Sequence, residues 1–116
     1  MSKDEILEIV RASRAKGTSS PFVGALDREA EIDTTMVQLE SCLVRPFSVE
    51  VVGAYYPQDS CEFIKKQNVI AIAEENKQYL LYSIKAKLFA KAWKTGENQF
   101  TILGFSTEDV IAEWRG

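Results

Sequence analysis

Residues Gln78–Trp93, which read QYLLYSIKAKLFAKAW, decide the fold class. Every second position from Leu80 to Ala92 is apolar or aromatic, and this is the period of a β-strand. A helix is the alternative, because a second apolar stripe follows the helical period and strong helix formers fill the run. We predict one long, bent strand over 78–93, because a hairpin signal follows it.

That hairpin signal is Thr95–Asn98, which leads into Gln99–Phe105, a segment rich in β-forming residues. Two segments before the long strand also have strand character. Phe47–Tyr56 alternates apolar and polar residues, and Asn68–Glu75 is apolar at its centre. The polar sequence Glu75-Asn76-Lys77 predicts a hairpin loop after the second of these.

Met36–Val44 is ambiguous, since its apolar residues fit either a strand or a helix. A helix there would begin at a capping box formed by Thr35 and Gln38. We favour a strand, because the turn signal Arg45-Pro46 then leads into the clearer strand that follows. The charged segment Asp27–Thr35 is expected to be a loop or a single helical turn.

Helices are expected at both ends of the chain. Ser2 and Glu5 form a capping box, and Gly17 follows the last apolar turn, which predicts an amphipathic helix over 3–16. Ser106 is expected to cap a second, short helix that runs to the last residue. Acidic residues in the first turn support this helix start.

Two connections have open interpretations. Phe22–Leu26 is either a loop over the core or a lid hinged at Gly24. Pro57–Ser60 predicts a turn, and Cys61–Gln67 is a helical turn or an edge segment.

This order of elements predicts an α+β fold, with an N-terminal helix packed on a curved, mainly antiparallel sheet of about four to five strands and a short C-terminal helix. The chain has 116 residues, so residues 1–116 are assigned to a single domain. Hydrophobic residues make up 46% of it, which excludes a disordered chain. A curled sheet with a helix across its mouth tends to enclose a cavity.

The charge of the chain is unevenly distributed. The net charge is −3, which argues against a nucleic-acid-binding protein. Residues 63–94 nevertheless carry seven basic and two acidic side chains.

Cys42 and Cys61 follow no secretory signal, and no stretch is apolar enough to span a membrane. We therefore expect a cytoplasmic protein with two free thiols and no membrane attachment.

The chain contains no histidine. This excludes Ser-His-Asp and Cys-His catalysis and the common zinc sites. No glycine-rich phosphate-binding motif is present either. We expect no cofactor and no metal, and a glutamate general base is the form of catalysis that remains.

Aromatic side chains are the most promising site signal. Clustered inside a curled sheet they would line a pocket for an apolar or cationic ligand, with one carboxylate as anchor. Alternatively the rings form a packed core or a dimer interface. The candidate residues are Glu50, Tyr55, Tyr82, Phe89, Trp93 and Phe100.

A lysine-rich face is the second signal. If 78–93 is a strand, Lys85, Lys87 and Lys91 share a face with Phe89 and Trp93. Cations between aromatic rings can bind a single nucleic-acid strand. A solvated sheet face or an edge strand protected by lysines explains the same pattern.

Three hypotheses follow. The first is a non-enzymatic accessory protein, expected to be a homodimer, that binds a partner protein or a small apolar or cationic ligand through its aromatic residues. The second is a small enzyme with Glu50 as general base in an aromatic-lined cavity. The third is a single-strand nucleic-acid binder, and the acidic net charge disfavours it.

Overall fold

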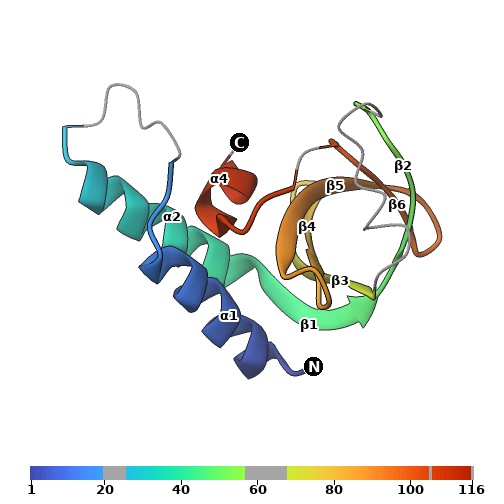
Figure 1. Cartoon of the computed structure of the whole chain (residues 1–116), viewed down its shortest axis with the longest axis horizontal. Helices are drawn as coiled ribbons and strands as arrows, with labels where there is room; N and C mark the ends of the chain where they lie inside the picture. Colours follow the sequence, from blue (N-terminus) through green and yellow to red (C-terminus); the bar gives the residue numbers. More distant parts are fainter. Residues whose placement is uncertain (20–25, 57–67, 105, 116) are drawn as a thin grey trace.

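The computed structural model describes residues 1–19, 26–56, 68–104 and 106–115. They form an α+β fold in which helices pack beside a rolled, mostly antiparallel sheet of six strands, a larger number than expected (Figure 1). The elements in chain order are α1 (Lys3–Ala15), α2 (Arg28–Cys42), β1 (Leu43–Ser48), β2 (Glu50–Ala54), β3 (Val69–Glu75), β4 (Gln78–Ser83), β5 (Leu88–Gly96), β6 (Gln99–Ile102) and α4 (Val110–Arg115).

The sheet is strongly curled. Its strand order is β1-β3-β4-β5-β6-β2, so β1 and β2 lie at opposite ends, although only Val49 separates them in the chain. The N–H of Val49 donates to Val69 O (3.1 Å), and the N–H of Glu50 donates to Asn98 O (3.0 Å). The chain thus passes from one end of the sheet to the other within a few residues, which requires a rolled sheet. β2 pairs with β6 in parallel, and the other strand pairs are antiparallel.

One continuous strand over Phe47–Tyr56 is therefore a wrong prediction. The alternation within it is real, but the segment contributes to two strands that pair with different neighbours. The arrangement of the whole sheet sets which strands pair, and a local sequence pattern does not predict that arrangement.

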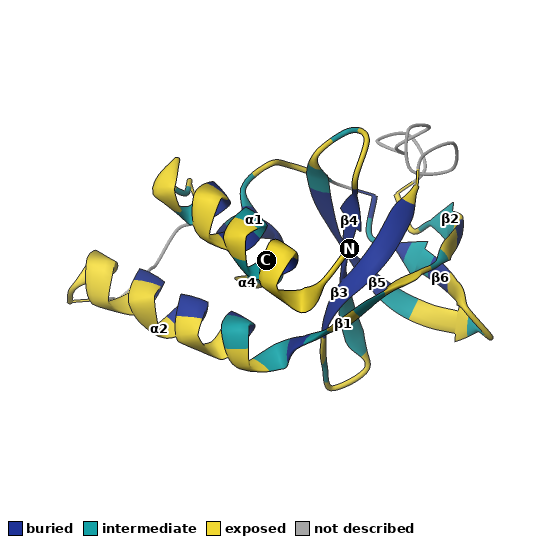
Figure 2. Ribbon diagram, turned by 90° about the horizontal axis from the view of Figure 1, so that it is seen from below, coloured by how far each residue is buried: buried dark blue, intermediate teal, exposed yellow. Residues whose placement is uncertain are grey.

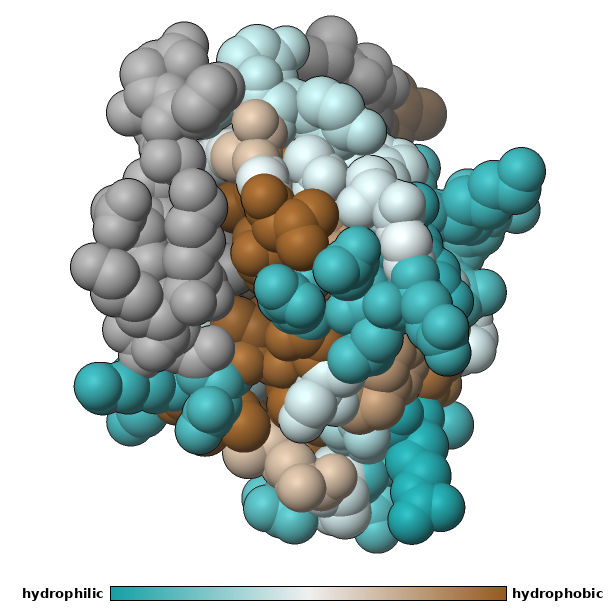
Figure 3. All heavy atoms as spheres, turned by 90° about the vertical axis from the view of Figure 1, so that its right-hand side faces the viewer, coloured by the Kyte–Doolittle hydropathy of each residue, from teal (hydrophilic) through white to brown (hydrophobic). Residues whose placement is uncertain are grey.

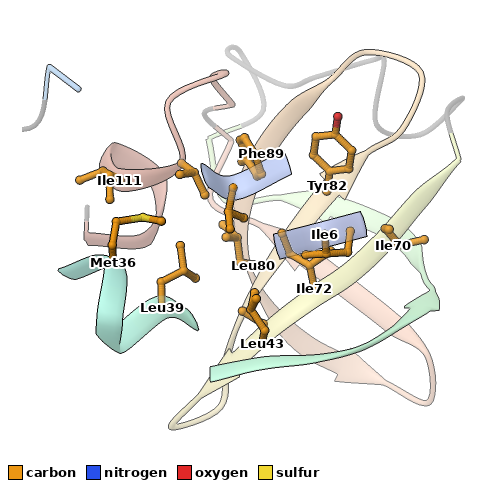
Figure 4. Close-up of a cluster of buried hydrophobic side chains, with 13 residues drawn as sticks. Ile6, Met36, Leu39, Leu43, Ile70, Ile72, Leu80, Tyr82, Phe89 and Ile111 are labelled. Carbon is orange, nitrogen blue, oxygen red and sulfur yellow. The ribbon is translucent and has the colours of Figure 1, made fainter. Parts of the chain in front are cut away.

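The helices cover one face of the sheet. Ile6 and Val10 of α1, Leu39 of α2 and Ile111 of α4 meet side chains of β3, β4 and β5 in one buried cluster (Figure 4). Figure 2 shows the same division along the helices, with buried positions toward the sheet and exposed positions outward. Burial of this face is the main stabilising contribution to the helix layer.

The other face of the sheet packs against itself. Its buried cluster comes from strands alone. Phe100 belongs to this cluster and is fully buried, and its ring centroid lies 4.8 Å from that of Tyr79 in an edge-on arrangement. Among the described residues, the concave side is thus occupied by core side chains, and the pocket described below lies instead between the helices and the sheet. The cluster consists of Val51, Val69, Ala71, Leu81, Ala90, Ala92, Phe100 and Ile102.

The first helix is confirmed. Ser2 and Glu5 form both hydrogen bonds of the capping box, and α1 ends at Ala15. Gly17 has φ of +94°, the left-handed conformation that a glycine adopts at low cost after a helix.

The second helix corrects two predictions. Asp27 caps it by accepting from the N–H of Ala30, so the charged segment 27–35 is helical. The helix continues to Cys42, and a strand over Met36–Val44 is wrong for all but its last two residues. Its buried side chains, Ile32, Thr35, Met36 and Leu39, follow the helical period.

The long strand over 78–93 is two strands. β4 and β5 form an antiparallel hairpin joined by a turn over residues 84–87. Lys87 ends this turn with φ of +58°. The strand character is confirmed, and the single bent strand is wrong.

The two other hairpins are confirmed. Asn76 and Lys77, both with positive φ, connect β3 to β4, and residues 97 and 98 connect β5 to β6. The strand after this second turn ends at Ile102, three residues earlier than expected.

The last helix begins later than expected. Asp109, not Ser106, caps it, because Asp109 Oδ1 accepts from the N–H of Ala112 (3.1 Å). Asp109 Oδ2 also accepts from the hydroxyl of Thr18 and the N–H of Ser19, which ties the end of α1 to the start of α4.

Several predicted features lie outside the described residues. They are the hinge at Gly24, most of Phe22–Leu26, the turn at Pro57–Ser60 and the segment Cys61–Gln67. Within the described chain, no helix is long and apolar enough to cross a membrane.

Candidate functional site

A polar pocket of about 250 Å³ lies between the helix layer and one end of the sheet. Thr35 and Gln38 come from α2, and Trp114 and Arg115 come from α4. The sheet contributes Glu75, Gln78 and Lys91. All seven side chains carry a polar group, and in Trp114 this is one N–H donor on an otherwise apolar ring.

The strand register places the three sheet residues on one face. Gln78 pairs with Glu75 across the β3–β4 hairpin and with Trp93 across the β4–β5 pair. Lys91 pairs with Leu80, two positions further along, and therefore projects to the same side as Gln78. This is the face that the helices cover.

Lys91 is the unusual residue of the pocket. Its side chain is 9% exposed, and a lysine that buried is normally paired. Within the described chain, no carboxylate reaches direct ion-pair distance of its ammonium, and the charge of Glu113 acts on it from farther away. Burial lowers the pKa of Lys91, and Glu113 partly opposes this shift.

Glu113 is the buried carboxylate of the region. It is 8% exposed, and it belongs to α4 next to Trp114. Burial raises its pKa from an ordinary value of 4.5 to about 7. Hydrogen bonds from Thr107 and from the backbone of Lys91, together with the charge of the Lys91 ammonium, oppose this rise. Glu113 is not among the residues that line the pocket, although its neighbours Trp114 and Arg115 are.

Backbone pairing brings α4 next to β5. Phe89 and Thr107 exchange two hydrogen bonds (2.7 and 3.1 Å), and Leu103 N–H donates to Lys91 O (3.0 Å). After β6 the chain therefore continues to pair along β5 as far as Thr107, before α4 begins. This return positions Glu113 near Lys91, although 22 residues separate them in the sequence.

A thiol contacts one of the residues that line the pocket. Cys42, a free cysteine at the end of α2, donates its S–H to Glu75 Oε2 (3.2 Å). Burial and this hydrogen bond raise the pKa of Cys42, so the thiol is not an activated nucleophile.

Among the residues described, no three or more acidic or cysteine side chains converge as a metal site requires.

The predicted aromatic site is divided among three places. Tyr82 and Phe89 contact each other, with ring centroids 5.0 Å apart, and line an apolar groove against α1 together with Lys87. Tyr55 and Trp93 form an edge-on pair with centroids 5.7 Å apart. Phe100 lies in the strand-only core.

Glu50 and Tyr55 belong to the face formed by β2 and β6. Glu50 is exposed at the start of β2, and Tyr55, just after this strand, is 57% exposed. Apolar atoms gather at the centre of this face and hydrophilic atoms border them (Figure 3). Glu50 therefore does not lie in an aromatic cavity.

The lysine-rich face is also divided. Lys85 and Lys87 are exposed in the turn between β4 and β5, whereas Lys91 is buried further along β5. Phe89 shares the face of Lys91 but is only 2% exposed. No row of lysines and open rings forms along this strand.

The sequence analysis missed Glu113 and the pocket. A signal for Glu113 was present, because it follows Val110 by three residues and so lies on the apolar face of the last helix. An acidic residue at such a position is either paired or has a raised pKa. The pocket itself depends on elements that are distant in sequence.

Comparisons with protein-family models, with curated proteins and with solved structures find no match to this chain. The pocket and the interaction of Lys91 with Glu113 are the features of the described chain that bear on function.

Proposed function

We propose that the protein is a non-catalytic binding domain that takes a small polar ligand into the pocket between α2, α4 and the β3–β4 hairpin. The observation that carries this proposal is Lys91, a residue that is 9% exposed, lines the pocket and forms no ion pair with any other described residue. A buried charge of this kind is costly unless something pairs with it.

The composition of the pocket supports binding of a polar molecule. Gln38 and Gln78 each offer an amide donor and acceptor, and the ring of Trp114 offers a flat apolar surface. The volume of about 250 Å³ is just below the ~300–1,000 Å³ of typical ligand sites. It therefore suits a ligand smaller than a drug-sized molecule.

The pocket favours binding over catalysis. Glu113 has the raised pKa of an acid–base catalyst, but it does not line the pocket. The thiol of Cys42 is directed to Glu75 and is held in its protonated form. Burial lowers the pKa of Lys91, and in this proposal Lys91 serves as the cation that holds the ligand, not as a nucleophile.

Binding can be tested by ¹H–¹⁵N NMR of the whole chain with a panel of small polar compounds, including acetate, acetamide, glycerol and methylammonium. Saturable shifts of the Lys91, Gln78 and Trp114 amides are expected for at least one compound. The variant Lys91→Met should lose or weaken the effect, whereas Lys94→Met, at an exposed position of the same strand, should retain it. Shifts that are absent for every compound, or that spread over the whole surface, would refute the proposal.

Homodimer formation remains a prediction, which light scattering of the purified protein tests. The exposed side chains around β2, among them Val52 and Tyr55, are the surface that such a contact would use. A monomer at all concentrations would end this prediction and leave the proposed pocket unaffected.

A further inference from the structure

We infer that the pocket binds its ligand through a carboxylate placed against Lys91, and that a proton is taken up at Glu113 when this anion binds. This inference rests on the proposed function, and it names the ligand chemistry and the pH response of the same site. It stands on one buried residue, Lys91, that lines the pocket and also interacts with a buried acid outside the lining.

The anion requirement follows from the position of Lys91. Lys91 lines the pocket, whereas Glu113, the carboxylate whose charge acts on it, does not line the pocket. A carboxylate entering the pocket would supply the direct ion pair and charge-assisted hydrogen bonds that the described chain does not provide. Glu75 also lines the pocket, so a ligand with one negative charge fits better than one with two or three.

Proton uptake follows from the sharing of one cation by two carboxylates. At neutral pH the charge of Lys91 helps to keep Glu113 ionised. A bound carboxylate adds a second negative charge close to the same cation, and two nearby carboxylates favour protonation of the more buried one. Glu113 is enclosed and does not line the pocket, so it is the group that protonates.

Other ionisable groups lie around the pair. Asp109, just before α4, raises the pKa of Glu113 by its charge, and Arg115 of α4 lines the pocket. The β3–β4 hairpin presents Glu75, which the thiol of Cys42 contacts. The lining residues from α2 are Thr35 and Gln38, which carry no charge. Burial raises the pKa of Glu113 to about 7, so Glu113 is the group of this region that titrates near neutral pH.

The probe for this inference is sodium acetate, with acetamide as the neutral analogue and sodium chloride as the ionic-strength control. Amide shifts of Lys91 and Gln78 give the dissociation constant at pH 6 and at pH 8, where acetate stays ionised. If binding raises the pKa of Glu113 by about one unit, acetate binds about fivefold more weakly at pH 8. Acetamide and chloride should bind much more weakly or not at all.

Two variants separate the parts of the inference. Glu113→Gln should bind acetate with nearly the same dissociation constant at pH 6 and pH 8, because the linked proton is gone. Lys91→Met should lose acetate binding, and Glu97→Gln, an exposed hairpin position, should behave as the wild type. Retained amide dispersion shows that each variant is folded, and Glu113→Gln alone still tests the proton linkage if Lys91→Met does not fold.

The outcomes distinguish this inference from the proposed function. Saturable binding of acetamide or glycerol without acetate would overturn the inference and keep the pocket as a ligand site. Acetate binding with the same pH dependence in the wild type and in Glu113→Gln would overturn the proton linkage. Absence of any saturable shift would overturn both proposals.

Discussion

The hydroxyl of Ser13, in α1, accepts a hydrogen bond from the backbone N–H of Val110, the first residue of α4, over 2.9 Å. The same hydroxyl donates to the carbonyl oxygen of Glu108 over 2.6 Å. Ser13 is buried, so these bonds are shielded from water. They fix the start of the helix that carries Glu113 and Trp114, and they connect the N-terminal helix to the pocket.

Ser13→Ala is therefore expected to destabilise the protein. It leaves the N–H of Val110 and the carbonyl of Glu108 with one partner fewer, at a cost of about 1–3 kcal/mol. The free energy of unfolding in urea measures this. Ser41→Ala is the matched control, because that exposed hydroxyl donates to Gln38 O within its own helix and otherwise contacts only the neighbouring thiol of Cys42 among the described residues. A Ser13→Ala effect no larger than the ~0.5 kcal/mol expected for the control would contradict the prediction.

Glu113 should make stability depend on pH. Its pKa is about 7 in the folded protein, against an ordinary value of 4.5, so the folded state binds this proton more tightly. The corresponding stability is fully present below about pH 4.5 and is lost as the pH rises to about 7. From pH 5 to pH 8 the wild type should lose about 2 kcal/mol relative to Glu113→Gln.

Urea unfolding of both proteins at several pH values checks this prediction. Glu97→Gln, in the exposed β5–β6 turn, should follow the wild-type curve. Parallel curves for the wild type and Glu113→Gln would mean that the pKa of Glu113 is not raised.

The turn between β3 and β4 offers a stabilising substitution. Asn76 and Lys77 have φ of 49° and 69°, the left-handed pair of a tight hairpin turn, in which glycine is preferred at the second position. Lys77→Gly should raise the free energy of unfolding by about 0.5–1 kcal/mol, whereas Lys77→Ala should not. Thermal unfolding of the two variants checks the contrast, and equal melting temperatures would count against it.

Two glycines should respond differently to alanine. Gly104 has φ of +128°, and a Cβ there would lie 2.8 Å from the backbone oxygen of Tyr56. Gly53 has ordinary φ and open space around the same position. Gly104→Ala should therefore lower the free energy of unfolding by more than about 1 kcal/mol, and Gly53→Ala should not lower it. Equal effects in urea unfolding would show that the close approach at Gly104 is unimportant.

The sequence predicted those elements whose signals are local. The capping box at Ser2 and Glu5 and the polar turn at Asn76 are determined by neighbouring residues alone, and both were predicted correctly. The turn over residues 84–87 escaped detection because it contains no glycine or proline. Its four residues also preserve the alternation, since an even insertion leaves the next strand in phase.

The errors and omissions elsewhere come from packing between distant segments. The strand-like alternation placed Val37 on one face with Leu39, but Val37 is exposed on α2. The buried positions Met36 and Leu39 are three residues apart and follow the helical period instead. The pocket depends on the segment between β6 and α4, which continues along β5 and pairs Thr107 with Phe89. No local sequence pattern predicts that Lys91 and Glu113 interact.

The coupling of Lys91 and Glu113 is tested most directly by a carboxyl ¹³C NMR titration of Glu113 in the wild type and in Lys91→Met, with Lys94→Met as control. Glu113 should titrate with a midpoint of about 7 in the wild type and in the control. The midpoint should rise further in Lys91→Met, because the attraction of the ammonium is lost. A midpoint near 4.5, or one that Lys91→Met leaves unchanged, would contradict the coupling.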